Sequence, residues 1–313
     1  MTLTTDEAPP TGSATWRADG ALVGAAFLFG TTFVVVKDAV AEVDPLPFLA
    51  VRFSIGAAAL ALASRLGLSA PAPVPSGAGD APAPGIVRHG VVAGLALWAG
   101  YVLQTVGLQY TDPSTSAFLT YMLVVVVPLL NLVFLRQPLQ WATGAGIVIA
   151  VAGLVLLTGG ASAGLGRGEV LTLGCAVGFA VHMLILGQTA ARHDPVRFTA
   201  VQLATVGAAS AVLATVDDPG NVVFGGAPLV AAALTGVFAT ALAFLAMVWA
   251  QRSVSPSRAA LILLTEPVFA AVLSWIDGDP LSATGALGGA LILVAVVVAE
   301  VLPARAATRR PAA

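Results

Sequence analysis

The sequence predicts an all-α membrane protein with ten transmembrane helices arranged as two inverted five-helix repeats. Three observations lead to this fold class. The 313-residue chain is 58% hydrophobic and only 10% charged, whereas soluble domains carry about 25% charged residues, so lipid must solvate much of its surface. The apolar residues fall into ten segments of membrane-spanning length. A block near the start of the chain also returns 150 residues later.

The ten apolar segments are each long enough, or nearly so, to cross about 30 Å of hydrocarbon at about 1.5 Å per residue. Barrel strands would be about ten residues long and would alternate in polarity. These segments are about twice that length and apolar on every face, which favours helices. We expect helices over residues 20–37, 45–66, 88–109, 114–134, 141–158, 169–187, 195–216, 227–250, 256–275 and 281–301.

The basic residues predict the orientation. If the N-terminus is cytoplasmic, eleven arginines lie on the cytoplasmic side and only Lys37 and Arg167 on the outer side. Positive charge concentrates on the cytoplasmic side of membrane proteins. We therefore expect a multi-pass protein of the cell (plasma) membrane with both termini in the cytoplasm. Residues 1–19 are expected to form a disordered tail, residues 67–85 a flexible loop and residues 303–313 a basic tail.

The repeated block indicates that one unit has been used twice. The stretch DPLPFLAV at 44–51 returns as DPVRFTAV at 194–201, and ATGA at 142–145 returns at 283–286. The predicted units cover residues 20–158 and 168–302. Each unit has five helices, an odd number, so the second unit must enter the membrane from the opposite face. Inverted repeats of this kind are typical of secondary transporters.

Several of these blocks resemble the drug/metabolite transporter superfamily, specifically its EamA-type transporters. The resemblance rests on GLQYT at 107–111, on FLT at 118–120 leading to VPLL at 127–130, and on LTEPVFA at 264–270, and it covers nearly the whole chain. Members often place Glu before the fifth helix of each unit, where this chain has Gln137 and Asp279. The resemblance implies a polytopic carrier, often an exporter of amino acids, metabolites or drugs.

Glu266 is predicted to be the main functional residue. It lies about 15 Å into its helix, close to the bilayer midplane, where an ionised side chain costs about 2.5–3.5 kcal/mol. We expect it to face a cavity or a partner; the alternative is a protonated packing residue. Pro267 follows it, and Pro128 lies in the fourth helix. Both remove helical hydrogen bonds, and matched breaks in the two halves indicate a binding site.

Other polar and aromatic side chains are candidates for substrate binding or coupling. Arg52 lies about 10 Å below the outer face, where it either pairs with an anionic group or snorkels to the interface. One face of the third helix carries an aromatic and amide stripe that either lines a pocket or packs between helices. Tyr121 is predicted to join this lining. The stripe consists of Trp98, Tyr101, Gln104 and Thr105.

Two further candidates lie in the second unit. His182 is about mid-depth in its helix, where it either relays protons or donates a hydrogen bond between helices. Gln202 occupies the place of Arg52 in the repeat, and it either binds solute or hydrogen-bonds between helices. Glycines spaced by four, at 90 and 94 and at 285 and 289, pack inside the monomer or form a homodimer face.

The sequence favours a secondary transporter of a small organic solute, a metabolite, amino acid or drug, exported by alternating access. A coupling proton or ion is a further hypothesis, with Glu266 as the candidate group for a proton. A lipid scramblase or a non-transporting membrane scaffold is the alternative. An intramembrane enzyme is less favoured, because neither a His-Glu-x-x-His motif nor an Asp-rich metal motif occurs. ATP-driven transport is not expected, because no phosphate-binding loop occurs. No catalytic residue, metal or cofactor is predicted. A net charge of -2 gives no reason to expect nucleic acid.

Overall fold

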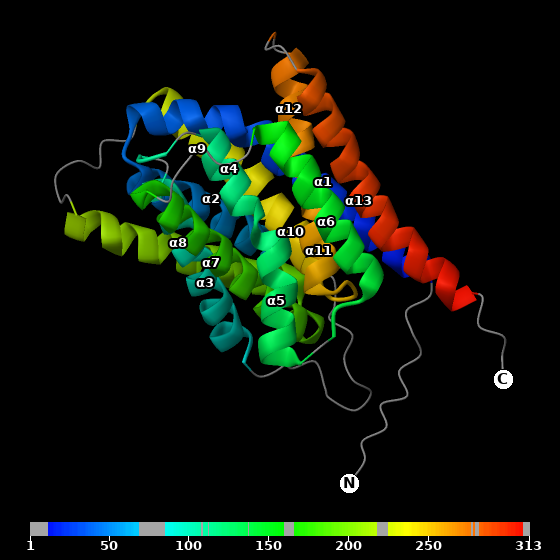
Figure 1. Cartoon of the computed structure of the whole chain (residues 1–313). Helices are drawn as coiled ribbons and strands as arrows, with labels where there is room; N and C mark the ends of the chain where they lie inside the picture. The colour runs from blue at the N-terminus through cyan, green and yellow to red at the C-terminus, as the bar shows by residue number, and fades with distance from the viewer. Residues whose placement is uncertain are drawn as a thin grey trace, which may run out of the picture.

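The structure is a computed structural model of the chain, and it describes residues 12–68, 85–107, 109–111, 113–136, 138–159, 166–217, 225–276, 278 and 282–308. Every regular element within these residues is a helix (Figure 1). Thirteen are α-helices, η1 is a 3₁₀ turn and η2 is a π-helix. In chain order the elements are α1 (Gly12–Glu42), α2 (Pro45–Arg65), α3 (Ile86–Gly107), α4 (Pro113–Tyr121), α5 (Leu123–Leu135), α6 (Trp141–Thr158), α7 (Arg167–Thr189), η1 (Ala190–Arg192), α8 (Pro195–Asp217), α9 (Ala227–Thr235), η2 (Gly236–Leu242), α10 (Ala243–Ala250), α11 (Pro256–Leu263), α12 (Glu266–Ile276) and α13 (Ala283–Thr308).

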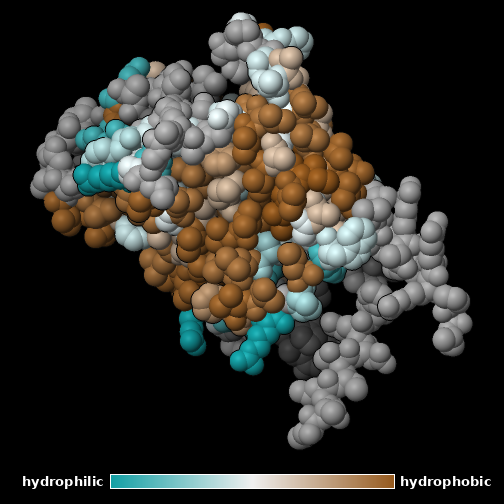
Figure 2. Space-filling model, viewed as in Figure 1, coloured by the Kyte–Doolittle hydropathy of each residue, from teal (hydrophilic) through white to brown (hydrophobic). Residues whose placement is uncertain are grey.

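Much of the surface is apolar. Figure 2 shows a broad hydrophobic face over α4, α5 and α6, with hydrophilic patches toward its ends. Phe134 of α5 and Val148 of α6 are each 71% exposed, which is costly in water and favourable in lipid. Among the described residues, eight helical stretches are long and apolar enough to span a membrane, and a shorter apolar helix covers Ala283–Ala299.

These features confirm an all-helical, multi-pass membrane protein. The count of ten spans and their pairing into two inverted repeats remain predictions.

The helix ends differ from expectation at both termini. α1 begins at Gly12, inside the stretch 1–19 expected to be disordered, and α13 continues to Thr308, inside the expected basic tail. The N-terminal extension has a physical cause: Ala18 is fully buried and Asp19 forms an ion pair with Arg258, so tertiary contacts hold this polar turn. The remainder of these tails, residues 1–11 and 309–313, and most of the expected loop, residues 69–84, lie outside the described residues.

The two proline-containing spans are interrupted. Met122 separates α4 from α5, which contains Pro128. Leu264 and Thr265 separate α11 from α12, immediately before Glu266 and Pro267. The break before Pro267 matches the loss of its N–H donor. The break at Met122 lies further upstream of its proline, so the two interruptions are not equivalent in register.

Glycines permit the close helix contacts. α3 packs against α7 and α8, and α6 packs against α13. A Cβ at Gly94 would lie 2.7 Å from Thr205 Cβ, and one at Gly90 would lie 2.6 Å from a Val201 methyl. Gly90 and Gly94 therefore pack inside the monomer, which is the first of the two alternatives given for them, the other being a homodimer face.

Candidate functional site

A cavity of about 330 Å³ lies between α1, α2, α3, α4, the start of α5, α7, α10 and the α11–α12 break. This size is within the range of small-molecule sites, about 300–1,000 Å³. Its walls are mainly apolar and aromatic, with a few polar and charged side chains. We call it the central cavity. It is lined by Phe29, Val36, Pro45, Phe48, Leu49, Arg52, Leu97, Tyr101, Gln104, Thr105, Ser116, Ala117, Thr120, Tyr121, Leu123, Phe179, His182, Met183, Phe244, Met247, Leu263 and Glu266.

Arg52 is held inside this cavity. Its side chain is 5% exposed, and its Nε donates a 2.8 Å hydrogen bond to Thr240 Oγ1. The guanidinium carbon lies 5.7 Å from the ring centre of Phe53 and 5.9 Å from that of Tyr101, which is within cation–π range. Of the two alternatives for Arg52, the structure favours the one in which it lines the cavity.

Thr240 reaches Arg52 because of an unusual local backbone. It belongs to η2, the π-helix Gly236–Leu242, and π-helical turns are rare and often found at functional sites. Two glycines let α2 approach η2 closely. A Cβ at Gly236 would lie 2.7 Å from the Arg52 carbonyl oxygen, and one at Gly56 would lie 2.9 Å from the Gly236 carbonyl oxygen. Sequence reasoning missed Thr240, since no periodic pattern signals a π-helix.

Glu266 is the first residue of α12 and lines the cavity at the helix break. It remains partly accessible, and the Tyr121 hydroxyl lies within hydrogen-bonding reach of its carboxyl group. Tyr121 is itself the last residue of α4, at the other break. Within the described part of the chain, the ion pair shorter than 4 Å joins Arg258 to Asp19. Arg52 and Glu266 thus share the cavity without forming an ion pair within 4 Å.

The third-helix stripe is divided between cavity and core. Tyr101, Gln104 and Thr105 line the cavity; the Gln104 amide donates to Thr120 Oγ1 at 3.2 Å. The Tyr101 ring packs edge-on against Phe179, with ring centres 5.2 Å apart. Trp98 does not line the cavity. Its side chain packs against the main hydrophobic core, and its Nε1 is buried with no hydrogen-bond partner.

The two second-unit candidates pair with each other. His182 Nε2 and Gln202 Oε1 are 2.8 Å apart, and the Gln202 amide also donates to the Phe198 carbonyl oxygen. His182 lines the cavity, whereas Gln202 is 1% exposed and does not. This arrangement matches the interhelical hydrogen-bonding alternative for Gln202. The described residues contain no group of three or more His, Cys, Asp or Glu side chains able to hold a metal.

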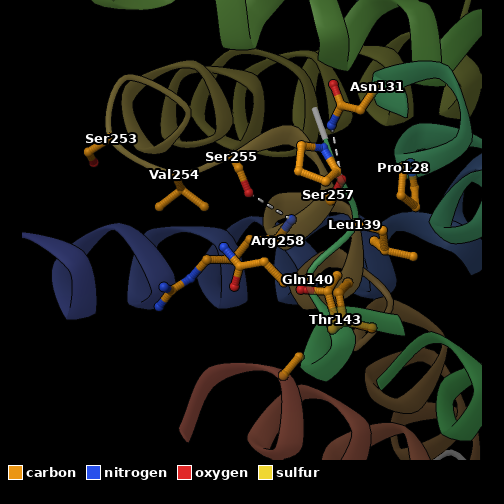
Figure 3. Close-up of a pocket in the computed structure, with 13 residues that line it drawn as sticks. Pro128, Asn131, Leu139, Gln140, Thr143, Ser253, Val254, Ser255, Ser257 and Arg258 are labelled. Carbon is orange, nitrogen blue, oxygen red and sulfur yellow. Dashed lines mark hydrogen bonds between the residues drawn. The ribbon is translucent and has the colours of Figure 1, made fainter. Parts of the chain in front are cut away.

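A second hollow, of about 360 Å³, lies at the end of the molecule where α5 ends and α6 and α11 begin. Figure 3 shows Asn131, from α5, donating a hydrogen bond to Ser257 of α11, with a distance of 3.0 Å. The Ser255 hydroxyl caps α11 by accepting from the Arg258 backbone N–H. Pro128 lines this hollow, whereas Pro267 lines neither. The second hollow is lined by Pro128, Asn131, Pro138, Leu139, Gln140, Thr143, Ser253, Val254, Ser255, Ser257, Arg258, Leu261 and Ala299.

A polytopic helical protein with interrupted spans around a partly polar cavity belongs, by architecture, with membrane transporters. The chain belongs to the EamA-like transporter family, whose sequence model matches it twice, over residues 16–159 and 166–300. It is similar to an uncharacterized transporter of Archaeoglobus fulgidus, with 28% identity over 285 residues, 90% of this chain and 85% of that protein.

A solved crystal structure shares the fold. It aligns with a TM-score of 0.74 and 21% identity, over 94% of this chain and 98% of the other. At this identity the likeness shows the fold alone. Family membership confirms the resemblance in the sequence, and it favours transport over catalysis.

Proposed function

We propose that the protein is a secondary transporter that moves a small organic solute through the central cavity by alternating access. The supporting observation is that Arg52 and Glu266 line the same cavity. A buried charge without a protein ion-pair partner is costly. In a member of a transporter family, the transported solute would supply the opposite charge. The ten spans would form two inverted five-helix repeats that rock about this cavity.

The solute that fits best carries both a carboxylate and an ammonium group on an apolar body. Arginine binds carboxylates with paired N–H donors, and Arg52 has only its Nε engaged by Thr240. Glu266 would take the ammonium group. The aromatic rings of Phe29, Phe48 and Phe179 would cover the apolar part. Amino acids, or metabolites shaped like them, have this chemistry.

Direction and coupling complete the proposal. Both termini would be cytoplasmic in the plasma membrane, because the arginines concentrate on that side. The solute would be exported. Glu266 would carry a coupling proton, since an intramembrane carboxyl group facing a cavity can change its protonation as the solute arrives.

The test is flux into sealed proteoliposomes. An equimolar mixture of the standard amino acids is supplied outside, and uptake is followed by mass spectrometry, with the corresponding decarboxylated amines as the comparison mixture. We expect uptake of one or more amino acids above protein-free vesicles, no uptake of the amines, and loss of uptake by at least tenfold in Arg52→Gln. Thr235→Val is the matched control, because the Thr235 hydroxyl bonds only the Ala231 carbonyl oxygen of its own helix.

A parallel measurement addresses the alternative function. The same vesicles are loaded with a fluorescent lipid and treated with dithionite, which bleaches only the outer leaflet. Vesicles that exchange lipid between leaflets but take up neither mixture would identify a scramblase and overturn the transport proposal.

A further inference from the structure

We propose that the second hollow is a further binding site for the same solute, on the cytoplasmic side of the central cavity, and that contacts of α11 keep the layer between the two hollows closed in this state. This inference rests on the proposed function. It adds a site that precedes the central cavity on the export path.

The second hollow has the polar chemistry of a binding site. Asn131 lines it and is 5% exposed, and its Oδ1 is buried with no hydrogen-bond partner. Such an atom costs about 1–3 kcal/mol unless a donor reaches it. The hydroxyls of Ser255 and Ser257 and the charge of Arg258 also line the hollow. A solute with an ammonium donor and a carboxylate acceptor satisfies both kinds of group, as it would in the central cavity.

The two hollows are similar in volume, about 360 and 330 Å³, so one solute fits either. A thin apolar layer separates them. Along α5 the lining changes from Leu123, in the central cavity, to Pro128, in the second hollow, which is about 7 Å of helix. Val124 and Val127 lie on α5 between these two positions, Leu264 follows the cavity-lining Leu263, and all three are 1% exposed or less. A layer of about one helical turn can be opened by a small helix displacement.

Two polar contacts hold α11 in place at the second hollow. Arg258 forms a two-bond ion pair with Asp19 of α1, with distances of 3.1 and 2.6 Å, and Ser257 accepts from Asn131 of α5. The Asn131 contact joins the second predicted repeat to the first, and the Asp19 contact joins the second repeat to the turn that precedes the first. A carboxylate arriving at Arg258 competes with Asp19, and a donor arriving at Asn131 competes with Ser257. Solute binding would therefore loosen the contacts that keep the apolar layer closed.

Cysteine labelling tests this directly, because the chain has a single cysteine, Cys175, and it is fully buried. In a Cys175→Ala background, Thr143→Cys reports on the second hollow and Thr105→Cys on the central cavity. Each is labelled with a membrane-impermeant methanethiosulfonate reagent, applied to whole cells or to inside-out vesicles. We expect Thr143→Cys to react only from the cytoplasmic side and Thr105→Cys only from the outside.

The amino-acid mixture supplies the ligand test. It should slow labelling of both reporters at least fivefold, whereas the decarboxylated amines should not slow Thr143→Cys. Adding Arg258→Gln should abolish protection of Thr143→Cys and keep protection of Thr105→Cys. If Arg258→Gln does not fold, Ser257→Ala, a smaller change at the same hollow, replaces it in this measurement. Protection of the central reporter alone, with flux intact, overturns the second site. Protection of neither reporter, with flux intact, overturns both the second site and the ligand class. Absence of flux overturns the proposed function instead.

Discussion

Arg52 Nε donates a 2.8 Å hydrogen bond to Thr240 Oγ1, across 188 residues of sequence. The bond joins α2 to the π-helix η2 and fixes the guanidinium plane beside the rings of Phe53 and Tyr101. Arginine carries five N–H donors, and this bond uses the one on Nε. The donors on the terminal nitrogens are thereby presented in a fixed direction, which is what paired recognition of a carboxylate requires.

Replacing Thr240 tests this positioning role. We expect Thr240→Val to raise the KM for the transported solute about tenfold, because a hydrogen bond to a charged group contributes about 1.5–3 kcal/mol and each tenfold is about 1.4 kcal/mol. Thr240→Ser keeps the hydroxyl and should restore the KM. Thr235→Val, in the preceding helix α9, should leave it unchanged. An unaltered KM in Thr240→Val would show that Arg52 does not depend on this bond.

Glu266→Gln tests proton coupling. The amide keeps the size and hydrogen-bonding capacity of the side chain but cannot exchange a proton. We expect flux in the variant to lose its dependence on a transmembrane pH gradient. Tyr121→Phe, which removes the hydroxyl within reach of Glu266, should keep that dependence but shift the pH at which flux is half-maximal. Transport by Glu266→Gln with its full pH dependence would eliminate Glu266 as the coupling group.

The α6–α13 contact predicts a stability difference between two adjacent glycines. A Cβ at Gly288 would lie 2.5 Å from the Gly153 carbonyl oxygen, whereas one at Gly289 would meet a Val268 methyl at an ordinary 3.5 Å. Overpacking costs about 1–3 kcal/mol. We expect Gly288→Val to lower the Tm in detergent by several degrees and Gly289→Ala to leave it nearly unchanged. Equal Tm values for the two variants would contradict the contact.

His193 predicts a pH dependence of stability. It lies between η1 and α8, outside the spanning helices, and its Nε2 is 2.8 Å from His89 Nδ1. Burial lowers the pKa of His193, and the neighbouring His89 and Arg192 lower it further; Asp194 is the adjacent acidic group. The unfolded chain therefore binds a proton more readily than the folded one. The contribution of neutral His193 is fully present above about pH 6.5 and is lost as the pH falls below that value.

The measurement is the Tm of the detergent-solubilised protein between about pH 7.5 and pH 5. The Tm of the wild type should fall toward acid pH. His193→Phe, which can pack on Phe198, 5.0 Å from the present ring, should fall less. His89→Phe retains His193 and removes one neighbour, so its fall should be intermediate. A wild type and a His193→Phe variant with parallel profiles would refute the assignment.

The candidate site was partly predictable from the sequence. Glu266 and Arg52 stand out because a charge within an apolar run is costly. The break before Pro267 fits its missing N–H donor, whereas the break at Met122 does not coincide with Pro128, which lies inside α5. Helical spacing placed Tyr101, Gln104 and Thr105 on one face, and all three line the cavity. The same spacing included Trp98, which packs in the core instead.

The sequence by itself determined the solvent, the helical class and which charged groups must be sheltered, because these depend on composition and on the properties of single side chains. Only the tertiary structure decided which face of each helix turns inward. Helices that are apolar all round, as in lipid, have no polar face to reveal that direction. Three features arise from packing between segments more than a hundred residues apart: the bond from Arg52 to Thr240, the ion pair from Asp19 to Arg258 and the hollow beside Asn131. A local sequence pattern does not predict such packing.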